Sequence, residues 1–61
     1  SRYIQQANNI ENQISNINKS IKELQKRPET EEIKARIERY KEQKVRMMNN
    51  LNERIKATQR Q

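Results

Sequence analysis

Apolar residues recur every three or four positions along the first half of the chain. The steps between them alternate between four and three without a break, which keeps these side chains on one face of an α-helix. This is also the heptad spacing of coiled coils. The spacing predicts a helix over residues 3–26, with an apolar stripe made of Tyr3, Ala7, Ile10, Ile14, Ile17, Ile21 and Leu24.

A second stripe predicts a helix over residues 31–59. It consists of Ile33, Ile37, Tyr40, Lys44, Met48, Leu51 and Ile55, with Met47 as the alternative to Met48. We expect the heptad pattern to slip near the two methionines, whose flexible side chains fill irregular gaps. Lys44 is the one charged residue of the stripe. We expect its alkyl stem to cover Ile14 while its ammonium group stays in water; the alternative is a role in fixing register or oligomeric state.

Pro28 marks a turn between the two stripes, because the chain contains one Pro and no Gly. Proline disfavours helical backbone at Arg27, and Thr30 can cap a new helix. Leu24 and Ile33 are nine residues apart, so one continuous helix would place the two stripes on opposite sides. The sequence therefore predicts a turn over residues 27–30 and an all-α fold, a single antiparallel two-helix coiled-coil hairpin spanning residues 1–61.

The two stripes also fit each other in register. We expect Leu24 to face Ile33, Ile21 to face Ile37, Ile17 to face Tyr40, Ile14 to face Lys44, Ile10 to face Met48, Ala7 to face Leu51 and Tyr3 to face Ile55. The numbers of each pair add to 57 or 58, which places the midpoint on the turn.

The amino-acid composition excludes most kinds of catalytic and metal-binding site. The chain has no Cys and no His, so disulfides, thiol nucleophiles, imidazole bases and the usual zinc ligands are excluded. We expect no enzyme, no cofactor, no metal and no small-molecule substrate. There is no signal-peptide pattern and no apolar run long enough to cross a bilayer, so we expect a soluble chain without membrane insertion. Its compartment is not indicated.

Self-association is expected from the shortage of apolar residues. Hydrophobic residues make up 30% of the chain, and two stripes form a thin core for a chain of this length. Isoleucine at both stripe positions favours assemblies of more than two helices. The polar residues that flank the first stripe oppose a wide apolar interior. We favour a homo-oligomer, or binding to a partner protein helix, over a monomer.

The net charge of +6 favours a second class of partner, one that carries negative charge. Lys19, Lys22 and Lys26 share one face of the first helix and Arg27 follows them, which makes these four residues a candidate contact for anions or nucleic acid. A solvated face is the alternative interpretation, since no aromatic or Gly-rich recognition element accompanies the charge. We also expect ion pairs at helical i,i+4 spacing, between Glu23 and Arg27, Glu32 and Arg36, and Glu42 and Arg46.

The layout of two heptad helices around Pro28 resembles several helical hairpins. These are the needle subunits of type III secretion systems, the amino-terminal coiled coil of hantavirus nucleoproteins and the amino-terminal regulatory helices of syntaxins. The resemblance implies the hairpin and carries over no functional residue. We expect a non-catalytic protein–protein interaction or assembly module that self-associates through the Ile-rich stripes. The alternatives are a basic nucleic-acid-binding accessory protein of a phage, virus or bacterium, and a regulatory helical segment of a larger protein.

Overall fold

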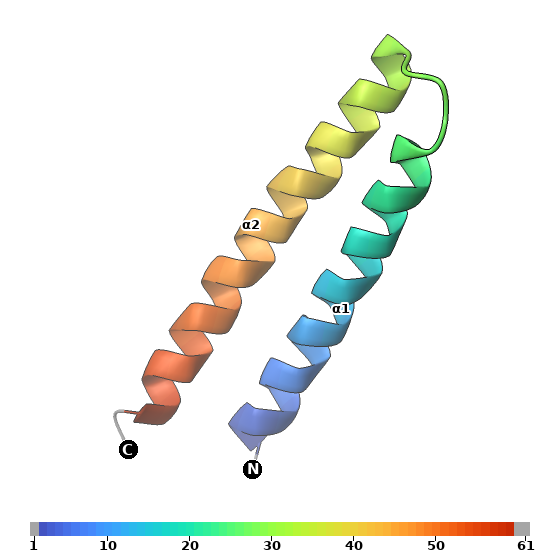
Figure 1. Cartoon of the computed structure of the whole chain (residues 1–61). Helices are drawn as coiled ribbons and strands as arrows, with labels where there is room; N and C mark the ends of the chain where they lie inside the picture. Colours follow the sequence, from blue (N-terminus) through green and yellow to red (C-terminus); the bar gives the residue numbers. More distant parts are fainter. Residues whose placement is uncertain (1, 60–61) are drawn as a thin grey trace.

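Two helices joined by a short turn make up the computed structural model, which describes residues 2–59 (Figure 1). Helix α1 spans Arg2–Gln25 and helix α2 spans Glu31–Gln59. The helices contact each other and run in opposite directions, which confirms the antiparallel hairpin. Helix α1 begins and ends one residue earlier than the predicted range of 3–26.

Local hydrogen bonds end the first helix and start the second. The backbone N–H of Arg27 donates to the carbonyl of Leu24 at 3.1 Å, a short-range bond that tightens the last turn of α1. Thr30 then caps α2, because its Oγ1 accepts a hydrogen bond of 3.1 Å from the backbone N–H of Ile33. The carbonyl of Thr30 accepts the first intrahelical bond, from the N–H of Lys34 at 2.9 Å. Residues on both sides of Pro28 therefore hold the chain reversal in place.

The two helices contribute unequally to the core. Within residues 2–59 the buried side chains are Ile10, Ile17, Ile21 and Leu24, all from α1, and Leu24 is the most enclosed at 3% exposure. Helix α2 has no buried residue in the same range. Its side of the contact is formed by half-buried residues at regular steps of three and four, namely Ile33, Ile37, Tyr40, Lys44, Met47, Leu51 and Arg54, and Arg36 and Ala57 are half-buried beside them. We call the residues at these regular steps and the stripe of α1 the seam.

The structure corrects the predicted course of the seam past the methionines. Met47 is half-buried, whereas Met48 is 46% exposed. The steps from Tyr40 through Lys44 and Met47 to Leu51 are four, three and four, so the heptad pattern continues without a slip. No slip is needed, because the distance from Tyr40 to Leu51 already fits regular steps, and Met48 lies beside the regular step rather than on it.

Near the end of α2 the half-buried residue is again the neighbour of the predicted one. The heptad step after Leu51 falls on Arg54, which is half-buried, and the predicted interface residue Ile55 is 40% exposed. Ile55 still lies next to α1, since it shares a hollow with Tyr3 and Ala7. At this end the guanidinium of Arg54 covers the seam and donates a hydrogen bond to Oε1 of Gln6.

The contacts that join the helices lie close to the predicted register. Leu24 and Ile33 line one hollow beside the turn, and Tyr3 and Ile55 line another near the chain ends, so each of these two predicted pairs shares a hollow. The hydrogen bond between Gln6 and Arg54 joins residues whose numbers add to 60, a difference that two long side chains can span. Figure 1 shows that α2 begins beyond the end of α1.

The hairpin is long and thin. Its Cα atoms extend over 48 × 14 × 10 Å. Its accessible surface is 5034 Å², compared with about 4,200 Å² for a compact protein of the same mass. One contact between two helices therefore leaves most of each helix in solvent, including part of the apolar surface of α2.

Candidate functional site

The seam has two flanks, and they differ in chemistry. Met48 and Ile55 each follow a seam residue of α2 directly, whereas Arg36 directly precedes the seam residue Ile37. Because successive residues on a helix are about 100° apart, the residues before and after a seam position lie on opposite sides of the seam. We call the side of Met48 and Ile55 the apolar flank and the side of Arg36 the arginine flank.

The apolar flank carries the most exposed large apolar side chains of the described residues. Ile4 is 57% exposed and Val45 is 56% exposed, and both lie on this flank together with Met48 and Ile55. Val45, Met48 and Ile55 share one face of α2 because they are three and seven residues apart. Ile4 and Ile55 line a common hollow of about 230 Å³ with Tyr3, which joins the two helices into one apolar surface. This surface covers the half of the hairpin away from the turn.

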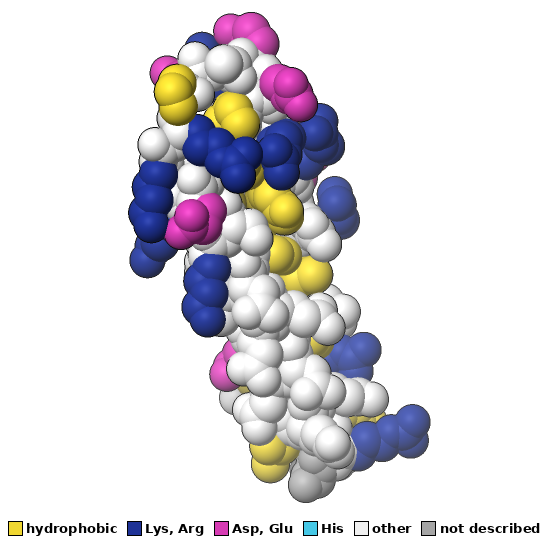
Figure 2. Space-filling model, turned by 90° about the vertical axis from the view of Figure 1, so that its right-hand side faces the viewer, with side chains coloured by type: hydrophobic (Ala, Val, Ile, Leu, Met, Phe, Trp, Pro, Cys, Tyr) yellow, Lys and Arg dark blue, Asp and Glu magenta, His cyan; other side chains and the backbone are white. Residues whose placement is uncertain are grey.

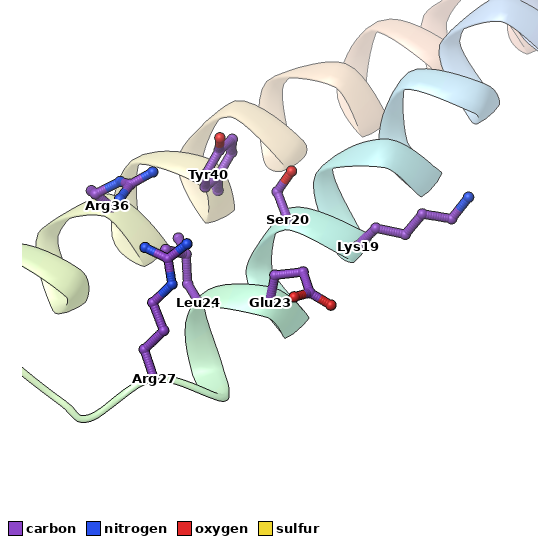
Figure 3. A pocket seen from close by; sticks show the side chains of 7 residues that line it. All are labelled: Lys19, Ser20, Glu23, Leu24, Arg27, Arg36 and Tyr40. Carbon is purple, nitrogen blue, oxygen red and sulfur yellow. The ribbon is translucent and has the colours of Figure 1, made fainter.

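The arginine flank has its charge next to the turn. Arg27 and Arg36 line a hollow of about 250 Å³ together with Leu24 and Tyr40. A second hollow of about 290 Å³ is lined by Arg36, Arg39, Tyr40 and Gln43. Figure 3 shows Arg27 from the turn and Arg36 from α2 at the same hollow, with the guanidinium group of Arg27 beside Leu24. The two hollows share Arg36 and Tyr40, so they form one continuous surface.

Arg27, Arg36 and Arg39 form no ion pair with any residue in the range 2–59. The ion pairs within residues 2–59 each join a lysine to the glutamate three residues before it: Lys26 to Glu23, Lys34 to Glu31, Lys41 to Glu38 and Lys56 to Glu53. The predicted pairs of Arg27, Arg36 and Arg46 with glutamates four residues before them do not form in this range. Arg27 lies beyond the end of α1, so helical spacing does not extend from Glu23 to it. Glu32 and Arg36 both lie in α2, but Arg36 lines a hollow with Leu24 of the other helix.

The four predicted anion contacts are all exposed, but they do not form one site. Lys26 is paired with Glu23 at 2.9 Å, and Lys22 is on the helix surface. Lys19 lines the edge of the arginine hollow, and its side chain points away from it in Figure 3. Arg27 alone reaches into the hollow. Figure 2 shows that Lys and Arg side chains gather most densely toward the turn on this face of the molecule.

Arg36 and Arg39 are the site residues that sequence reasoning missed. Their signal is present in the sequence, because Arg36 flanks the seam on the side on which Arg27 leaves α1. Lys44, by contrast, is half-buried in the seam as expected from its position, and it forms no ion pair within residues 2–59.

The described residues contain no cluster of three or more acidic, Cys or His residues that could hold a metal ion. Neither helix, over the part of the chain that the structure describes, has the length and apolar character needed to cross a membrane. Comparison of the chain with protein families, with curated proteins and with solved structures finds no match.

Proposed function

We propose that the chain is a non-catalytic assembly module and that a second copy of the hairpin covers the apolar flank. The observation that supports this most directly is the distribution of exposure in α2. Within residues 2–59 this helix has no buried residue, and its exposed Val45, Met48 and Ile55 lie on a single flank with Ile4 of α1. Apolar surface gathered on one side in this way is typical of a protein contact.

Energetics favour such a contact. Burying one large apolar side chain completely is worth about 1.5–3 kcal/mol, and these side chains are about half covered in the single hairpin. A two-fold symmetric contact uses the same patch on both copies, so each residue contributes twice. A chain of this size has few other sources of stability. The loss of translational and rotational freedom offsets part of this gain, so we expect association to depend on concentration.

The length of the apolar flank is consistent with a second copy as its occupant. The residues of α1 that continue this flank toward the turn are Glu11, Asn18 and Gln25, which are polar. The contact between copies is thus limited to the half of the hairpin near the chain ends. A short contact of this kind does not require the wide apolar interior that the polar flanking residues oppose.

Sedimentation equilibrium over about a hundredfold range of concentration tests the proposal. We expect the unaltered chain to move from monomer to dimer within this range. Met48→Glu places a charge in the proposed contact and is expected to remain a monomer with unchanged helicity. Asn49→Glu, at an exposed neighbouring position outside the flank, is the matched control and should dimerise like the unaltered chain.

Two results contradict self-association through this surface. One is an unaltered chain that remains a monomer at every concentration. The other is an equal effect of Met48→Glu and Asn49→Glu, which would mean that added negative charge in general, and not its place on the apolar flank, changes the assembly.

A further inference from the structure

We propose that the hollow between Arg27 and Arg36 binds a phosphate group of a nucleic acid strand. We call Arg27, Arg36, Arg39 and Tyr40 the tip clamp. This site is separate from the apolar flank, because it lies on the other side of the seam and next to the turn.

The first argument is the unbalanced charge of the tip clamp. Arg27 comes from the turn and Arg36 from α2, and both line one hollow with Leu24, the most enclosed residue of the described chain. No carboxylate within residues 2–59 is paired with Arg27, Arg36 or Arg39. Guanidinium groups directed to the same hollow repel one another. An anion placed between them removes that repulsion and gains an attraction to each.

The second argument is the geometry of the donors. A guanidinium group presents a planar fork of N–H donors that matches two oxygens of a phosphate, so arginine is well suited to phosphate contacts. The hollow of about 250 Å³ at Arg27 and Arg36 continues into the one of about 290 Å³ at Arg39. Together they have room for a phosphodiester and part of the attached nucleotide. Tyr40 lines both hollows and offers an aromatic ring for a neighbouring base.

The third argument concerns the choice between a nucleic acid and an acidic peptide. The chain has a net charge of +6, and Lys19 and Lys22 are exposed on the same half of the hairpin as the tip clamp. A nucleic acid strand offers a regular row of charges to such a surface, whereas a peptide offers isolated carboxylates. Glu23 lines the edge of the hollow, but its carboxylate is held by Lys26 at 2.9 Å and points away from the arginines in Figure 3.

Fluorescence anisotropy of the full chain with a labelled oligothymidylate, and with a duplex of the same length, tests the proposal. Arg27→Gln combined with Arg36→Gln removes the two facing charges. Arg2→Gln combined with Arg46→Gln removes two charges from exposed positions away from the hollow and is the matched control. We expect the tip variant to bind at low salt about tenfold or more weakly than the unaltered chain, and the control variant to lose about threefold or less.

The salt dependence gives a second readout. Each lost phosphate contact lowers the slope of log K against log salt by about 0.7 for a single strand, so the tip variant should lose about 1.4 in slope. Binding to the single strand, the duplex or both supports the phosphate site and identifies the form of the strand. Equal weakening of the tip and control variants overturns it, because diffuse charge then accounts for the affinity.

Two further outcomes also overturn the proposal. One is the absence of binding to either nucleic acid at low salt. The other is binding of an oligoglutamate peptide that depends on Arg27 and Arg36 in the absence of nucleic-acid binding. Sedimentation of the tip variant keeps this test independent of the assembly proposal: its oligomeric state should match that of the unaltered chain, since these arginines lie away from the apolar flank.

Discussion

Ile17→Asp is expected to abolish the helical signal of the chain in far-ultraviolet circular dichroism. Ile17 lies near the middle of α1 and is 7% exposed. An aspartate there places a carboxylate among apolar side chains, which costs several kcal/mol. A single small core of this kind supplies about 3–5 kcal/mol in total. The substitution therefore removes most or all of the stability of the hairpin.

Asn16→Asp is the control for this experiment. It introduces the same side chain one residue away, at an exposed position of the same helix. We expect Asn16→Asp to keep the helical signal and to melt within a few degrees of the unaltered chain. If Ile17→Asp retains its helicity and melts together with Asn16→Asp, then Ile17 does not lie in a buried seam and the packing described here is incorrect.

Leu24→Ala is expected to have the next largest effect. Leu24 is the most enclosed residue, at 3% exposure, and packs where the two helices meet next to the turn. Truncating a buried leucine typically costs about 2–5 kcal/mol, through lost transfer energy and the cavity that remains. In a protein of this size about 1 kcal/mol changes the melting temperature by 4–8 °C. We expect a decrease of about 10 °C or more in a thermal melt.

Met48→Ala is the control for Leu24→Ala, because it also shortens an apolar side chain but does so at an exposed position. Met48 is 46% exposed on the apolar flank. At concentrations at which the chain is a monomer, this substitution should cost less than about 1 kcal/mol. Its effect should instead appear at high concentration, as weaker self-association. Equal melting temperatures for Leu24→Ala and Met48→Ala under dilute conditions would contradict the unequal burial of these two residues.

The sequence predicts the hairpin because several independent signals agree. The alternating steps of the stripes predict two helices, and Pro28 with the cap at Thr30 predicts where the chain reverses. The register is specified less firmly by the sequence. These turn signals fix where the backbone reverses but not how far it travels along the axis before α2 begins. A displacement of two or three residues would still bring apolar residues of one helix next to those of the other, because the stripes repeat every three or four residues.

The seam differs from the predicted stripe at two places in α2. Met47 and Met48 are equally apolar, so hydrophobicity does not choose between them, and a slip in the pattern points to Met48. At the next step hydrophobicity favours Ile55 over Arg54. The regular geometry of the helix selects Met47 and Arg54 instead, and Arg54 is tolerated because its stem is apolar and its guanidinium reaches Gln6. The displaced residues Met48 and Ile55 then become part of the apolar flank.

The tip clamp required the structure for a different reason. Helical spacing suggests that Arg27 and Arg36 pair with Glu23 and Glu32, which would make them ordinary surface residues. The sequence does not show that Arg27 lies past the end of α1 or that Arg36 lines a hollow with Leu24 of the other helix. The direction of a long side chain depends on the path of the turn and on the packing across the seam, and neither follows from the spacing of residues along the chain.

The distance between spin labels at Asn9→Cys and Asn52→Cys tests the intramolecular hairpin most directly. Both positions are exposed, and their numbers place them at nearly the same level of the two helices. The labelled chain is diluted with unlabelled chain, so that only distances within one molecule are measured. The hairpin predicts a separation of about 25 Å or less, since packed helices lie 8–10 Å apart. One continuous helix would separate the labels by about 65 Å, and that result would contradict the fold and the two surfaces described on it.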